Sequence, residues 1–184
     1  MTQEGRKQMS WMDQIGGLLQ QYTGAAQGQA PNEVHDHFDQ VAQTAPPSVL
    51  ANGLAAAFRS DQTPAFGQML GQMFGQSNNQ QRAGILNTLV GALGPTVVSQ
   101  VLQRQGASGL AGLFGGGQAH VSPDTAAQVS PEAVAELAAH AEQKDPSIID
   151  TVSNFYAEHP TLVKGLGAAA LGIAMSRIAG GLNR

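Results

Sequence analysis

Apolar side chains recur at three- and four-residue intervals along most of this 184-residue chain, the spacing of a helix with one buried side. No stretch alternates apolar and polar residues for long, and β-branched residues are sparse, so the pattern predicts no strands. The spacing therefore predicts an all-α fold, a multihelical bundle of short amphipathic helices. The main apolar sets are Trp11, Ile15, Leu18, Leu19 and Tyr22; Val34, Phe38 and Val41; Leu50, Leu54 and Phe58; Phe66, Met69, Leu70, Met73 and Phe74; Ile85, Leu86, Leu89, Val90 and Leu93; Val97, Val98, Val101 and Leu102; Val134, Leu137, Ala138 and Ala141; Ile148, Ile149, Val152, Phe155 and Tyr156.

The nine prolines divide the chain into segments of helical length. In the first turn of a helix the missing N–H of proline costs nothing, and its fixed φ is already helical. Four of the prolines follow residues that commonly cap helices, which are Thr63, Ser122, Ser130 and Asp145. We therefore predict a helix start at each proline.

Gly-rich sequence separates two helical regions. We expect a disordered extension over 1–8, an N-terminal helical bundle over 9–104 and a Gly-rich linker or loop over 105–120, before a C-terminal helical domain over 121–184. A shorter linker of small residues lies at Thr23–Ala30. One continuous domain with a long loop is an equal alternative to this division.

The low charge content of the chain limits the classes of partner that it can bind. Charged residues make up only 12% of the chain and the net charge is −4, so copies of the chain repel one another weakly, which favours self-association. Basic residues do not cluster beyond Arg6 and Lys7, so we predict that nucleic acid is not a partner. The chain has no cysteine, which excludes disulfides, iron–sulfur clusters and zinc sites with Cys ligands.

The N-terminal sequence MTQEGRKQ is not followed by the apolar run of a signal peptide. We therefore expect a cytoplasmic protein. Met1 and Met9 are both possible natural starts.

The C-terminal stretch YAEHPTLVKGLGAAALGIAMSRIAGG is rich in small and apolar residues. Its uncharged run, Gly165–Ser176, is shorter than the roughly 20 residues that cross a bilayer, so it predicts no membrane span. GLGAAA fits a dinucleotide fingerprint, but no strand precedes it. We predict a buried helix that begins at Pro160, whose Gly167 and Gly172 let another helix, or a second copy of the chain, approach closely.

The densest polar cluster is EVHDHFD, residues 33–39. On a helix Glu33 and His37 share one side, as do His35 and Asp39, whereas the two histidines point far apart and cannot share a metal. We interpret the cluster as a solvated surface. His140 follows Glu136 by four residues and is expected to form a surface pair with it. No catalytic motif, cofactor site or metal site is evident, so we predict a protein that is not an enzyme.

Phe66, Met69 and Met73 form a stripe that suits either a core or an adaptable binding surface. We assign them, with Gly167 and Gly172, as candidate interaction residues. The predicted function is a non-enzymatic interaction or structural protein that binds itself or another protein through an apolar helical face. The alternative is a small-molecule or lipid carrier with a cavity lined by Met and Phe.

The segment VSPDTAAQVSPEAVAELAAHAEQKDPSIIDTVSNFYAEHPTLVKGLG, together with MDQIGGLLQQ near the N-terminus, resembles the YidB-like group of bacterial proteins. The resemblance lies in the order and composition of the helices across most of the chain. It implies a small multihelical bacterial protein of the cytosol, and it supplies no active-site residues.

Overall fold

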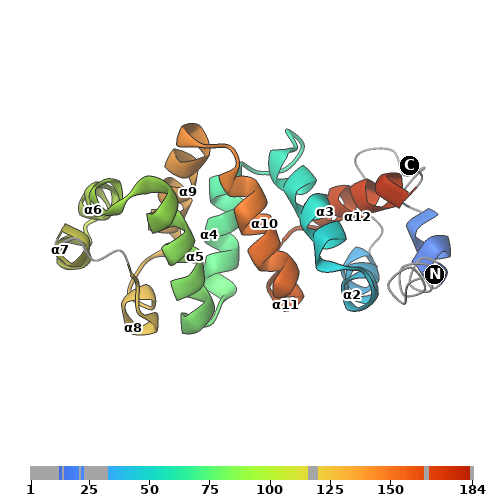
Figure 1. The fold of residues 1–184 in the computed structure, drawn as a ribbon, viewed down its shortest axis with the longest axis horizontal. Helices are drawn as coiled ribbons and strands as arrows, with labels where there is room; N and C mark the ends of the chain where they lie inside the picture. The colour runs from blue at the N-terminus through green and yellow to red at the C-terminus, as the bar shows by residue number, and fades with distance from the viewer. Residues whose placement is uncertain are drawn as a thin grey trace, which may run out of the picture. The chain divides into compact units, whose positions relative to one another are not determined.

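In the computed structural model the described residues are helical between short turns and form no strand, which confirms the all-α prediction (Figure 1). The predicted extension over 1–8, the choice between Met1 and Met9 as the start, and the linker Thr23–Ala30 lie outside these residues. The described residues are 13, 15–20, 22, 33–115, 120–163 and 166–182.

Residues 15–20 are helical, and the labelled helices follow them along the chain. Their bounds are α2 (Val34–Thr44), α3 (Pro47–Arg59), α4 (Phe66–Gln76), α5 (Asn79–Leu93), α6 (Pro95–Arg104), α7 (Ser108–Gly115), α8 (Pro123–Ala126), α9 (Pro131–Lys144), α10 (Ile148–Glu158), α11 (Pro160–Val163) and α12 (Ala168–Leu182).

Helix contacts group the chain into two compact units, and the grouping differs from the expected division near residue 105. Unit 2 is the continuous segment Pro64–Val152, and unit 1 combines the chain up to Thr63 with the chain from Ser153 onward. The reason is long-range pairing: α9 packs mainly on α4, and α12 packs mainly on α3. The expected linker over 105–120 also contains a helix, α7, which packs against α6.

Proline and serine set several helix starts, as predicted, but α4 and α10 begin two residues after Pro64 and Pro146 instead of at them. Proline is the first residue of α3, α6, α8, α9 and α11. The Ser122 and Ser130 hydroxyls accept backbone N–H bonds from Thr125 and Ala133, at 3.3 and 3.2 Å. Thr63 instead closes the end of α3, because its hydroxyl donates to the carbonyls of Ala57 and Ser60. Residue 31 lies outside the described residues.

Two glycines with positive φ turn the chain before and after α6. Gly94, with φ of 86°, lies between α5 and α6, whose axes bend by 114°. Gly106, with φ of 79°, follows α6 and places the Ala107 N–H 2.8 Å from the Leu102 carbonyl. This bond closes the end of α6. Because φ is positive at both glycines, each turn depends on a residue that tolerates a left-handed backbone.

The core follows the predicted apolar spacing. The apolar sets of α2, α3, α5, α9 and of residues 15–22 are buried wherever they are described, except Leu18, which is half-buried. The predicted single helix from Pro160 is wrong, because α11 ends at Val163 and α12 starts at Ala168. Between them the Leu166 N–H bonds the Val163 carbonyl at 2.9 Å, and the Gly167 carbonyl accepts the first bond of α12, from Leu171.

Candidate functional site

The helix α12 has one buried side and one exposed side of small residues. Its buried residues include Leu171, Met175 and Ile178. On the other side lies a surface that we call the α12 outer face, whose residues are exposed except for the half-exposed Gly172 and Ile173. It consists of Ala168, Ala169, Gly172, Ile173, Ser176 and Gly180.

The two predicted interaction glycines lie at or beside this face. Gly172 belongs to it, and Gly167 is exposed one residue before α12 begins. A Cβ atom added at Gly167 or Gly180 would meet no atom of the described residues within 4 Å. Packing within the described chain therefore does not require glycine at these two positions. Arg177 of α12 is a charged residue next to the face.

The buried side of α12 shows what a glycine does where a helix approaches closely. A Cβ atom at Gly53 of α3 would lie 2.8 Å from the Ala174 carbonyl oxygen and 2.8 Å from Cγ1 of Ile178. Real Cβ atoms do not come so close, so α3 and α12 meet at a distance that only glycine allows. Unit 1 therefore already contains one close helix contact of the kind predicted for the outer face.

The other predicted interaction residues lie in the core, which corrects their assignment to an accessible face. Phe66, Met69 and Met73 are 1%, 2% and 0% exposed. They occupy one side of α4, and Gln68 and Gln72 on another side are exposed. Burial leaves these three side chains unable to meet a partner at the surface of the folded chain. The carrier hypothesis, which needs a ligand among them, stays a prediction.

The third side of α4 is a glycine stripe, which the sequence reasoning missed. Gly67, Gly71 and Gly75 are spaced four residues apart and face α9. A Cβ atom at Gly71 would lie 2.7 Å from the Pro131 carbonyl oxygen, and one at Gly67 would overlap the Ala135 carbonyl oxygen. Rows of residues four apart on two helices interlock in the commonest class of helix packing. The stripe therefore fixes how α4 and α9 meet.

A short repeat in the sequence carries the signal for this stripe. From Phe66 to Gln76 the chain reads FGQM, LGQM, FGQ. A four-residue repeat places each residue type along its own side of a helix. The repeat thus gives α4 its glycine side, its glutamine side and its apolar side. The repeat predicts a close contact with another helix more specifically than apolar spacing alone does.

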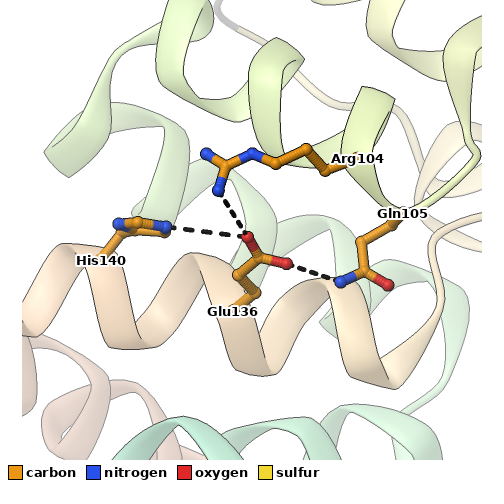
Figure 2. Close-up of polar contacts among 4 residues, drawn as sticks. All are labelled: Arg104, Gln105, Glu136 and His140. Atoms are coloured by element: carbon orange, nitrogen blue, oxygen red, sulfur yellow. Dashed lines mark hydrogen bonds and ion pairs between the residues drawn. The ribbon is translucent and has the colours of Figure 1, made fainter.

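Glu136 of α9 is the centre of a polar cluster with the end of α6 (Figure 2). Its carboxylate lies 3.3 Å from Nη1 of Arg104, accepts a 2.5 Å bond from Nε2 of Gln105, and lies 3.8 Å from Nε2 of His140. The pair with His140 is the one predicted from the sequence. The Arg104 side chain is 59% exposed, so this cluster stabilises the fold by at most about 1 kcal/mol.

The cluster over residues 33–39 is only partly the solvated surface that we predicted. His35 and Asp36 are exposed. In contrast, Nδ1 of His37 and the Tyr22 hydroxyl lie 2.7 Å apart and form a hydrogen bond. The other ring nitrogen of His37 lies 3.6 Å from the Glu33 carboxylate, the same-side pair expected on a helix. Burial raises the pKa of the Tyr22 phenol, and the negative charge of Glu33 raises it further. This arrangement favours a neutral phenol, which suits an anchor better than a nucleophile.

The remaining cations of unit 2 close helix ends. The Arg82 guanidinium donates to the carbonyls of Phe74 and Gly75, at 3.0 and 2.9 Å, where α4 ends. It also lies 5.1 Å from the centre of the Phe74 ring. Lys144 donates to the Ala92 carbonyl at the end of α5, at 3.1 Å. Cations at these positions donate to the carbonyls of a helix's last turn and interact favourably with the helix dipole.

In the part of the chain that the structure describes, no three His, Asp or Glu side chains gather where they could hold a metal ion. Across the same residues no single helix is long and apolar enough to span a membrane. Helices α5 and α6 have that length and apolar character only when they are taken together, as a bent pair.

Comparison with protein-family models, with curated proteins and with solved structures finds no match to this chain. The resemblance to the YidB-like group therefore stays a prediction.

Proposed function

We propose that this chain is a non-enzymatic helical interaction protein that associates with a second copy of itself, or with another protein, through the α12 outer face. The observation that carries the proposal is the row of small residues exposed on this helix. Ala169 and Ser176 are exposed and Gly172 is partly exposed between them, so only small side chains cover the backbone over about two turns, and the partly exposed Ile173 supplies apolar area beside them.

The cost of glycine in a helix supports a role for this face. Glycine inside a helix costs about 1 kcal/mol relative to alanine. At Gly53 and Gly71 close packing against another helix offsets that cost. At Gly180 no atom of the described chain lies where a side chain would go. If a helix of a partner packed on the outer face, close packing would offset the cost of glycine at Gly180, as it does at Gly53 and Gly71.

Charge placement favours a protein partner over nucleic acid. The chain has nine Lys and Arg against 13 Asp and Glu, and the three cations of unit 2, which are Arg82, Arg104 and Lys144, are each engaged with a helix end or with Glu136. Nucleic-acid affinity depends mainly on basic side chains that neutralise phosphates. A neutral face of small residues offers instead close contact between backbones, which suits another helix.

The test is light scattering on a size-exclusion column, over a hundredfold range of loading and at two salt concentrations. We expect a mass above 19.0 kDa that rises with loading and persists at high salt, because apolar contacts are not screened by salt. A constant 19.0 kDa at every loading would contradict self-association. Native mass spectrometry of the purified chain would then test for a bound small molecule or lipid, which the carrier hypothesis requires.

A matched pair of variants tests the location. Gly180→Glu places a charge on the outer face, two residues before the last residue of α12. Gly91→Glu makes the same change two residues before the end of α5, at another exposed glycine without a neighbour within 4 Å of its added Cβ. We expect Gly180→Glu to weaken association at least tenfold and Gly91→Glu to leave it unchanged. Equal loss in both variants would place the interface elsewhere.

A further inference from the structure

We draw no further inference here: the strongest candidate, the hydrogen-bonded side-chain cluster of Tyr22, His37 and Glu33 that joins the N-terminal helical residues to α2, belongs to the anchoring contact already described, and nothing in the described structure shows a group on which it would act.

Discussion

Replacing Gly71 with alanine adds one methyl group to the side of α4 that faces α9. The new Cβ atom would lie 2.7 Å from the Pro131 carbonyl oxygen and 3.2 Å from the Ala135 Cβ atom. The carbonyl belongs to the backbone at the start of α9, so it cannot rotate away as the end of a side chain can. Either α9 moves outward or the two helices tilt, and both changes disturb the core.

Two effects of opposite sign decide the result. Alanine gains about 1 kcal/mol over glycine from helix propensity alone. Overpacking a well-packed contact costs about 1–3 kcal/mol, and occasionally more. Because the obstacle is backbone, we expect the second effect to win and Gly71→Ala to lower the free energy of unfolding by up to about 2 kcal/mol once the propensity gain is subtracted. Gly67→Ala should cost at least as much, since its Cβ atom overlaps the Ala135 carbonyl.

The assay is urea unfolding followed by far-UV circular dichroism, with transition midpoints compared because two units need not unfold together. Gly91→Ala is the control: it lies in α5, is exposed and has no atom within 4 Å of its added Cβ, so propensity alone should raise stability by about 0.5–1 kcal/mol. If Gly71→Ala raised the midpoint as much as Gly91→Ala does, the close contact between α4 and α9 would not exist.

Three further substitutions test single contacts. Asn87→Ala removes the amide that bonds both the N–H and the carbonyl of the buried Val121. Urea unfolding should show a free energy of unfolding lower by about 1–3 kcal/mol, and an unchanged value would mean that water replaces both bonds. Glu136→Gln removes the ion pair with Arg104 and should cost at most about 1 kcal/mol, with the difference from the parent chain shrinking as salt is added; an effect independent of salt would contradict an ionic origin. Burial raises the pKa of Tyr22 in the folded chain, so its contribution to stability is complete below the phenol's unfolded pKa and is lost as pH rises from there through the higher folded pKa. Tyr22→Phe should therefore flatten the fall in stability that urea unfolding measures above about pH 10, and an unchanged fall would contradict the assignment.

The helices and their buried sides could be predicted because their signals are local. Ser130 with the proline after it starts α9, and Val34 and Phe38 mark the buried side of α2, as their spacing indicated. The end of α11 at Val163 escaped prediction, since the apolar residues continue past Gly165 and only the backbone shows the break. α7 escaped for the opposite reason, because glycine around Leu110 indicated a loop, whereas its packing against α6 makes it helical.

The pairing of helices could not be predicted from one sequence. The contact of Gly71 with Pro131 joins residues far apart in the chain, and no local pattern names the partner of a helix face. For the same reason Phe66 and Met73 were assigned to a possible binding surface, although apolar spacing shows only that one side is covered. The outer face of α12 was anticipated in part, because Gly172 was singled out, but the buried side could be separated from the exposed side only once α3 was in place.

The few charges of this chain also explain which contacts remain for a partner. Asp124 and Glu132 lie in the first turns of α8 and α9, and Arg104 and Lys144 lie in the last turns of α6 and α9. At these positions charge offsets the helix dipole and the unpaired groups of the helix end. Helix sides such as the glutamine side of α4 and the α12 outer face are thereby left with neutral residues. A partner that binds such a side must recognise shape and hydrogen bonds, so its affinity should change little with salt. A partner held by the charged helix ends would instead dissociate as salt rises, and the salt dependence of binding therefore tells which part of the surface is used.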